Sequence, residues 1–215
     1  MQASPGDPHA EQLVALAGLP LDQSGRAVVM IHGRGASPRN ILDLIPRLDR
    51  PGFSYVAPAA ANNTWYPFSF LEPLAKNEPY LTSALKRLGH VVRDITTAGI
   101  PAQRIVLLGF SQGACLAAEF AYRHAERLGG AVLFSGGLIG PPGTTWPTTR
   151  SFTRTPVFLG CSDVDAHVPR WRVDETADVF SHMDADVTKR IYPGMGHVIC
   201  DDELLAAQSL LDQVR

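Results

Sequence analysis

The chain carries a serine, a pair of aspartates and a histidine whose types and order could perform nucleophilic catalysis. Ser111 stands in Gly-Phe-Ser-Gln-Gly, Asp163 and Asp165 lie in a short acidic segment, and His197 follows Pro-Gly-Met-Gly. A serine hydroxyl is a poor nucleophile near neutral pH, so it needs a base within hydrogen-bond reach and a carboxylate that holds this base. The order serine, aspartate, histidine supplies all three groups.

The residues around Ser111 form the pattern G-x-S-x-G, with Gly109 and Gly113 at its ends, which is the nucleophile elbow of α/β-hydrolases. In an elbow the serine sits on a strained turn between a strand and a helix, and a Cβ at either glycine position would clash. The same pattern also occurs in ordinary Gly/Ser-rich turns. Its context favours the elbow, because the apolar run 105–108 suits a buried parallel strand and residues 114–125 read as a helix.

His197 is the histidine best placed to be the base, since it lies in a glycine-rich turn before the last expected helix. His9 falls in the N-terminal segment, and His90, His124 and His182 fall on expected helices. The choice of carboxylate stays open at this point. Two residues apart after a strand end, the two aspartates share a face in an extended segment and diverge in a turn, so periodicity does not choose.

The segment His32-Gly33-Arg34-Gly35 follows a strand and could form an oxyanion hole, because its glycines allow backbone N–H groups to face a ligand. The donors would be the N–H of Arg34 and the N–H of Gln112, the residue after the nucleophile. The alternative is an ordinary strand-to-helix turn. The elbow downstream favours the oxyanion hole.

An aromatic-rich loop over residues 59–75 could line a pocket for the acyl or alcohol part of a substrate. The candidate substrate-binding residues are Trp65, Tyr66, Phe68 and Phe70. The alternative is that this loop packs over the edge of the sheet, and the sequence leaves both open.

Strands and helices alternate along most of the chain. Apolar runs predict strands at 12–18, 27–32, 53–58, 105–108, 131–137, 156–160 and 187–192, and helical periodicity predicts helices near 38–48, 78–98, 114–125, 171–183 and 202–214. This pattern predicts an α/β fold with a mostly parallel central sheet and helices on both faces. In such sheets the ligand site lies beyond the carboxyl ends of the strands, and the candidate catalytic residues all follow strands.

The length of 215 residues suits one α/β domain over residues 12–215, preceded by a polar, flexible tail over residues 1–11. The 19 Lys and Arg against 21 Asp and Glu give a net charge of −2 with no basic stripe, so a nucleic-acid partner is not expected. Strand-sized apolar runs argue against a membrane span, and the N-terminus is unlike a signal peptide.

Three cysteines, Cys115, Cys161 and Cys200, are odd in number and widely spaced, which is neither a disulfide framework nor a zinc pattern. Cys115 and Cys161 are predicted to be small buried residues. No metal and no cofactor is expected, and a reducing cytoplasm is the expected location. A homodimer stays open.

Four segments, HGRGAS, GFSQGA, GCSDVDAHVP and YPGMGH, resemble in order and spacing the phospholipase/carboxylesterase family of α/β-hydrolases. That family includes bacterial carboxylesterases and acyl-protein thioesterases, and the resemblance covers about residues 20–214. It implies an α/β-hydrolase fold without a large lid domain, and a cofactor-free enzyme that cleaves carboxylic esters or thioesters.

The resemblance also selects the carboxylate, because the second aspartate of the family's D-x-D-x-x-V-P segment is the triad member, which here is Asp165. Asp163 is then expected to cap the turn that presents Asp165. Two departures stand near the site: Arg34 replaces a leucine usual in eukaryotic thioesterases, and Cys161-Ser162 replaces a common His-Gly. Both argue against the long-chain lipid substrates of those relatives.

We therefore expect a serine carboxylesterase that acts on short acyl chains through a Ser111, His197, Asp165 triad and an acyl-enzyme. Its partner would be a small-molecule ester. One alternative is a catalytically silent α/β-hydrolase that serves as a ligand receptor or interaction module, although drift would then be free to erase the triad. A second alternative, a dienelactone-type hydrolase, usually carries cysteine where this chain has Ser111.

Overall fold

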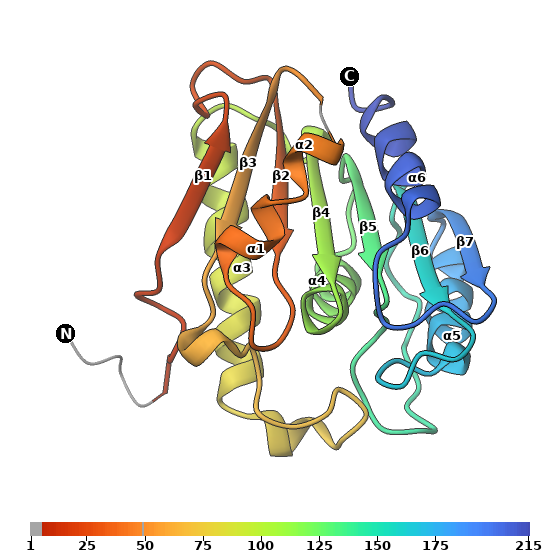
Figure 1. Ribbon diagram of the computed structural model, residues 1–215. Coiled ribbons are helices and arrows are strands. Elements are labelled where there is room, and N and C mark those ends of the chain that lie inside the picture. The colour runs from red at the N-terminus through yellow and green to blue at the C-terminus, as the bar shows by residue number, and fades with distance from the viewer. Residues whose placement is uncertain (1–5, 49) are drawn as a thin grey trace.

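A seven-stranded sheet in the order β1-β3-β2-β4-β5-β6-β7 forms the centre of the molecule (Figure 1). The structure, a computed structural model, describes residues 6–48 and 50–215. Strand β1 pairs antiparallel with β3, and every other neighbouring pair is parallel. The strands are β1 (Val14–Gly18), β2 (Arg26–Ile31), β3 (Phe53–Pro58), β4 (Ile105–Phe110), β5 (Gly130–Phe134), β6 (Pro156–Ser162) and β7 (Asp186–Tyr192).

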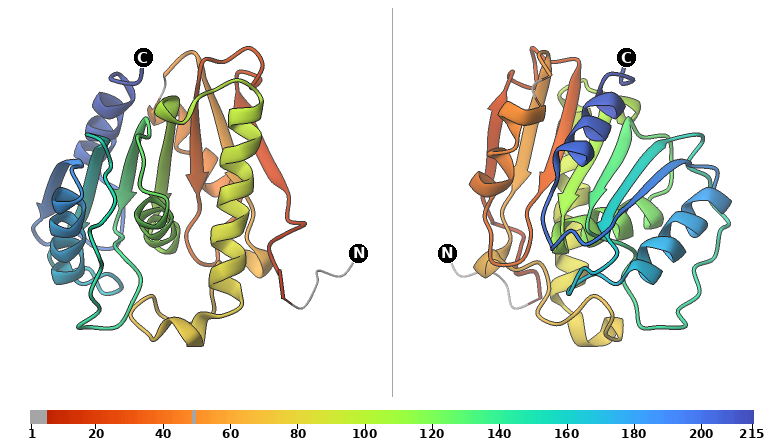
Figure 2. Two further views of the ribbon diagram at one scale, coloured as in Figure 1. Left: turned by 180° about the vertical axis from the view of Figure 1, so that it is seen from behind. Right: turned by 45° about the vertical axis from the view of Figure 1, so that its right-hand side comes forward.

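Helices cover both faces of this sheet (Figure 2). One face carries α1 (Pro38–Leu42), α2 (Ile45–Leu48) and α6 (Asp201–Leu211), and the other carries α3 (Tyr80–Thr97), α4 (Gln112–Arg123) and α5 (Arg170–His182). Three short turns of 3₁₀ helix complete the chain: η1 (Ala61–Asn63), η2 (Leu74–Asn77) and η3 (Ala102–Arg104). The predicted α/β-hydrolase architecture is confirmed, and within the described ranges only loops and short turns lie beyond the carboxyl ends of the strands.

Most element boundaries differ from the sequence-based expectation by one to three residues, and two of the differences have a structural reason of their own. The helix expected near 38–48 is two short helices separated by Asp43 and Leu44. The strand expected over 131–137 ends at Phe134, because Ser135 adopts a φ of 48° that is incompatible with a strand. Both differences shorten an element at the edge of the site rather than move it.

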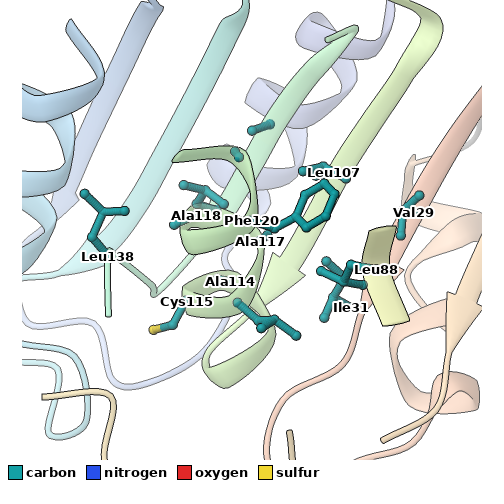
Figure 3. Packing of buried hydrophobic residues seen from close by; sticks show 14 of the residues in the cluster. Val29, Ile31, Leu88, Leu107, Ala114, Cys115, Ala117, Ala118, Phe120 and Leu138 are labelled. Atoms are coloured by element: carbon teal, nitrogen blue, oxygen red, sulfur yellow. The ribbon is translucent and has the colours of Figure 1, made fainter. Parts of the chain in front are cut away.

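Helix α4 packs directly behind β4 through small side chains (Figure 3). Its inner surface carries Ala114, Cys115, Ala117 and Ala118, all buried, so the helix approaches the sheet closely. A Cβ on Gly113 would lie 2.1 Å from the carbonyl oxygen of Ile31 in β2. Only glycine allows this approach, because an oxygen fixed in a strand cannot move away.

The N-terminal segment is packed against the domain, which corrects the predicted flexible tail for the residues that the structure describes. Residues 1–5 of that tail lie outside them. Asp7 accepts hydrogen bonds from Ser83 and Lys86 on α3 at 2.6 and 2.5 Å, and His9 is fully buried. A composition rich in Pro, Gly and polar residues predicts a loose chain, but composition carries no information about individual long-range contacts of this kind.

None of the helices in residues 6–48 and 50–215 is both long and apolar enough to cross a membrane.

Candidate active site

Ser111 occupies the tip of a strained turn between β4 and α4. Its φ of 57° and ψ of −122° lie outside the regions that a serine normally adopts. The turn is held by the Ser111 N–H, which donates to the Phe134 carbonyl at 2.9 Å. A Cβ on Gly109 would lie 2.5 Å from the backbone of Gly113, so the steric reason predicted for the two glycines is confirmed.

His197 lies in the loop between β7 and α6 and contacts both partners expected of a base. Its Nε2 is 2.8 Å from the Oγ of Ser111, and its Nδ1 is 2.6 Å from the Oδ2 of Asp165. The imidazole also packs between the rings of Phe110 and His167, with ring centres 4.9 and 4.7 Å away. Two hydrogen bonds and two ring contacts fix the plane of this side chain.

Asp165 is the carboxylate that contacts the histidine. Its second oxygen accepts the backbone N–H groups of His167 and Val168 at 2.8 and 2.9 Å. Burial raises the pKa of Asp165, but the hydrogen bonds from His197 and from these two N–H groups outweigh burial and hold the pKa below its usual value. The side chain is therefore an ionised acceptor near neutral pH.

Asp163 caps a different turn from the one expected. It was predicted to cap the turn that presents Asp165, yet its Oδ1 accepts the N–H of Gly194 at 2.8 Å, in the turn that leads to His197. Asp163 is exposed and has no contact with the imidazole. The two aspartates therefore hold the two different loops that meet at the site.

A cavity of about 480 Å³ opens beside Ser111. Its lining includes both predicted oxyanion-hole residues, Arg34 and Gln112. It also includes a continuous stretch of the aromatic loop, residues 66–70, which we call the aromatic wall. Tyr66, Phe68 and Phe70 are thus at the cavity, as predicted for substrate-binding residues. The other lining residues are Gly33, Arg34, Ala36, Phe110, Ser111, Gln112, Cys115, His167, Val168 and His197.

Trp65 does not line the cavity, which corrects its predicted place among the substrate-binding residues. The side chain is fully buried, with its ring 5.0 Å from the ring of His32 and 5.5 Å from that of His9. Its indole N–H donates to the carbonyl of His32 at 2.8 Å. A buried indole N–H needs such an acceptor, and this one ties Trp65 to the residue that follows β2.

Arg34 and Gln112, the two predicted oxyanion-hole residues, stand at the ends of β2 and β4. Among the described residues, neither of their backbone N–H groups donates to a protein acceptor. Their side chains hold the aromatic wall: the guanidinium of Arg34 donates to the carbonyls of Pro67 and Phe68, at 2.7 Å each, and the amide of Gln112 donates to the carbonyl of Tyr66 at 2.8 Å.

The whole aromatic wall is fixed through its backbone. Asn77, fully buried, accepts the N–H of Phe68 at 2.8 Å and donates to the carbonyl of Ser69 at 3.0 Å. The carbonyl of Phe70 accepts the N–H of Gly140 at 2.8 Å. Every carbonyl from Tyr66 to Phe70 therefore accepts a hydrogen bond, so the wall is a rigid surface rather than a loose loop.

The cysteines near the site are buried, as predicted, and unreactive. Burial raises the pKa of Cys115 to about 12, and burial with the nearby Asp165 carboxylate raises that of Cys161 to about 12. A thiol must lose its proton to become a nucleophile, so neither competes with Ser111. In the described part of the chain, no group of three or more His, Cys, Asp or Glu side chains is arranged to hold a metal ion.

Comparison with known proteins assigns the family. The family model described as phospholipase/carboxylesterase matches residues 19–215. The chain belongs to this family. A crystal structure of a phospholipase/carboxylesterase from Dyadobacter fermentans superposes with a TM-score of 0.88 at 40% identity, covering 94% of this chain and 96% of that one.

Two curated relatives of this family member are named acyl-protein thioesterase 1. The one from Neurospora crassa is 32% identical over 147 residues, which is 66% of this chain and 60% of that protein. The chain thus spans less than two thirds of the length of this relative. The one from Eremothecium gossypii is 28% identical over 211 residues, covering 86% of this chain and 88% of that protein.

Glu203 is a site residue that the sequence reasoning missed. It lies in α6, just after the loop of His197, and is fully buried. Its Oε2 accepts the N–H of Cys200 at 2.9 Å, which fixes the first turn of the helix, while its Oε1 is buried without a hydrogen-bond partner. The signal that could have found it is a glutamate three residues after the N-cap residue of a helix, here Cys200.

Glu203 makes the stability of this carboxylesterase-family protein depend on pH. Burial raises the pKa of the Glu203 carboxyl from 4.5 to about 7. Between these two pH values the Glu203 carboxyl is ionised in the unfolded chain but protonated in the folded chain. The free energy of unfolding is therefore highest below the unfolded pKa and falls as pH rises to the folded pKa. We expect Glu203→Gln, which cannot ionise, to gain stability relative to the wild type as pH rises over this range, and urea unfolding at several pH values measures the difference.

The exposed Glu11→Gln serves as the control, and its stability difference from the wild type is expected to stay constant over the same range. A Glu203→Gln difference that does not change with pH would show that the Glu203 carboxyl ionises equally in both states.

Proposed function

We propose that this protein is a serine hydrolase that cleaves carboxylic esters and thioesters through an acyl-enzyme. The observation that carries the proposal is the continuous hydrogen-bonded series from Asp165 through His197 to Ser111, with distances of 2.6 and 2.8 Å. The family membership supports the same reaction class. The exposed cavity beside Ser111 supports a small-molecule substrate.

In the proposed first step, the Oγ of Ser111 attacks the carbonyl carbon of the ester while Nε2 of His197 takes the hydroxyl proton. The carbonyl π electrons move to its oxygen, and they return as the bond to the alcohol or thiol breaks. The imidazolium gives its proton to this leaving group, so an acyl-Ser111 ester remains. In the second step a water molecule attacks the acyl carbonyl carbon while Nε2 of His197 takes its proton. The bond to the Oγ of Ser111 then breaks, the imidazolium returns the proton to this Oγ, and the carboxylic acid leaves.

Asp165 supports both steps by holding the N–H of His197 and stabilising the imidazolium that forms. Its lowered pKa is consistent with this role, because a carboxylate that stays ionised provides the negative charge throughout. The contacts from Phe110 and His167 keep the imidazole in the plane that serves both partners.

The backbone N–H groups of Arg34 and Gln112 are the proposed oxyanion donors. They stand at the carboxyl ends of neighbouring parallel strands, and both residues line the cavity beside Ser111. Such donors stabilise the negative charge that develops on the substrate oxygen, and removing one costs roughly 10²- to 10³-fold in kcat.

The proposed substrates carry short acyl chains. The aromatic wall bounds the cavity, and its backbone hydrogen bonds to Arg34, Gln112 and Asn77 oppose any opening for a long chain. No contact among the described residues favours a silent receptor over an enzyme. Labelling with a fluorophosphonate probe distinguishes the two.

We expect the wild-type protein to react with a fluorophosphonate probe, and Ser111→Ala to be unreactive, because the probe needs a serine activated by a base. The same substitution should lower the hydrolysis of p-nitrophenyl butyrate by roughly 10⁴- to 10⁶-fold, which is the loss that follows removal of a triad member. Circular dichroism checks that the variant is folded. A wild-type protein that ignores the probe would support the silent receptor.

The two aspartates should separate in a matched pair of substitutions. Asp165→Asn removes the charge that fixes the His197 tautomer and should lower kcat by roughly 10⁴-fold. Asp163→Asn retains an oxygen that can accept the Gly194 N–H, so its turnover should stay close to that of the wild type. Steady-state kinetics of both folded variants measures the split, and the opposite pattern would assign the triad carboxylate to Asp163.

Substrate chain length tests the role of the aromatic wall. We expect kcat/KM to be higher for acetyl and butyryl p-nitrophenyl esters than for the palmitoyl ester, because the fixed wall limits the length of chain that reaches Ser111. The esters are compared below the concentration at which the long-chain substrate forms micelles. A higher kcat/KM for the palmitoyl ester would contradict the proposed short-chain preference.

A further inference from the structure

His9 is a fully buried side chain whose role the reaction above leaves open. It precedes the region matched by the family model, residues 19–215, so nothing in the family assignment accounts for it. Its backbone N–H donates to the Oγ of Ser83 on α3 at 2.9 Å. Its imidazole contacts the segment that leads into the aromatic wall.

The imidazole of His9 bonds to both ends of one short segment, residues 61–65. Its Nδ1 accepts the N–H of Ala61 at 2.9 Å, and its Nε2 lies 2.9 Å from the carbonyl of Trp65. Only the neutral tautomer with a proton on Nε2 satisfies both partners, because a carbonyl needs a donor and an N–H needs an acceptor. Burial lowers the pKa of His9, which favours this neutral form.

The opposite side of the same segment holds the proposed oxyanion-hole residues. The carbonyl of Asn63 accepts the N–H of Gly35 at 2.8 Å, which fixes the residue after Arg34. The N–H of Trp65 donates to the side-chain oxygen of Gln112 at 2.9 Å. Residues 61–65 therefore stand between His9 and both of the proposed oxyanion donors.

Two further bonds join this region to the end of β2. The indole N–H of Trp65 donates to the His32 carbonyl, and the N–H of Ala60 donates to the Nε2 of His32 at 3.1 Å. The position of the strand end from which the Arg34 N–H projects is thus tied to residues 60–65.

The segment needs support because its backbone is strained. Asn62 and Asn63 adopt φ values of 51° and 55°, in the left-handed region, which asparagine enters at a smaller cost in free energy than most residues other than glycine. Strained residues persist only where surrounding contacts determine them. His9 supplies a contact at each end of the strained pair.

We propose that His9 is a positioning residue, which clamps residues 61–65 in the conformation that holds the backbone N–H groups of Arg34 and Gln112 in the oxyanion hole. The inference rests on the proposed function, since it needs an oxyanion to be stabilised. Arg34, Gln112 and Asn77 hold the aromatic wall independently of His9. Loss of the clamp therefore affects the transition state more than the binding of substrate.

The test variant is His9→Phe, which keeps a ring against Trp65 and Tyr80 but removes both side-chain hydrogen bonds. The matched control is Arg87→Met, because Arg87 ties the same N-terminal segment to α3 through the carbonyl of Ala10 at 3.3 Å without contacting residues 61–65. Titration with a fluorophosphonate counts the active sites of each preparation, so partial unfolding does not affect the kcat obtained. A wild type that does not react with this reagent would reject the proposed function itself, before the His9 variant is compared.

We expect His9→Phe to lower kcat by roughly tenfold or more, a part of the 10²- to 10³-fold effect of losing one donor, with KM nearly unchanged. The inhibition constant of a trifluoromethyl ketone, whose adduct with Ser111 carries an oxyanion, should rise by the same factor. Arg87→Met should retain the wild-type kcat and inhibition constant.

A kcat for His9→Phe within about twofold of the wild type, or a rise in KM alone, would overturn the proposal. So would a matching loss in Arg87→Met. If His9→Phe fails to fold, His9→Gln and His9→Ala are measured in the same way. His9→Gln retains a donor for the Trp65 carbonyl, whereas His9→Ala retains neither side-chain hydrogen bond. A wild-type kcat and inhibition constant in folded, titrated His9→Ala would overturn the proposal.

Discussion

The close approach of α4 to β2 is the constraint on which the rest of the site depends. A Cβ on Gly113 would lie 2.1 Å from a strand carbonyl, so the helix begins at its observed depth only because that atom is absent. This depth forces Ser111 into a φ of 57° and turns its side chain out of the sheet. It also brings Gln112 within reach of the loop that crosses above β2. A steric fact about one glycine therefore determines the position of the nucleophile and of one wall of the cavity.

The aromatic wall shows how a segment without regular structure becomes rigid. Its carbonyls are bonded by side chains from three separate parts of the chain, Arg34, Asn77 and Gln112, and by the N–H of Gly140. One such hydrogen bond contributes about 0.5–1.5 kcal/mol, so the set is worth several times that amount. Backbone groups that would otherwise be buried without partners are thereby satisfied. Arg34 and Gln112, whose backbone N–H groups are the proposed oxyanion donors, also hold the aromatic wall through their side chains, so the proposed reaction and its chain-length preference share one scaffold.

The sequence contained the parts of this arrangement that depend on local residue type. The glycines of the elbow and the alternation of strands and helices are visible as spacing, because each expresses a short-range steric or periodic requirement. The choice of Asp165 over Asp163 is not, and only the resemblance to the family indicated it. The burial of His9 and of Trp65 is not visible in this way. Both residues make hydrogen bonds to partners far away in the sequence, 56 positions for His9 with Trp65 and 33 positions for Trp65 with His32, and no periodicity reports such contacts. The role of Asp163 was misjudged for the same reason, since its partner lies 31 positions away.

Two carboxyl groups near the loop of His197, those of Asp165 and Glu203, have pKa values shifted in opposite directions. Asp165 accepts two backbone N–H groups as well as the imidazole, so its pKa stays low despite burial. Glu203 is buried with one oxygen unpartnered, and its pKa rises to about 7. A negative charge on one carboxyl makes ionisation of the other less favourable, so a more nearly neutral Glu203 favours an ionised Asp165. Donor count, rather than residue type, thus decides which acid carries the charge that the histidine needs.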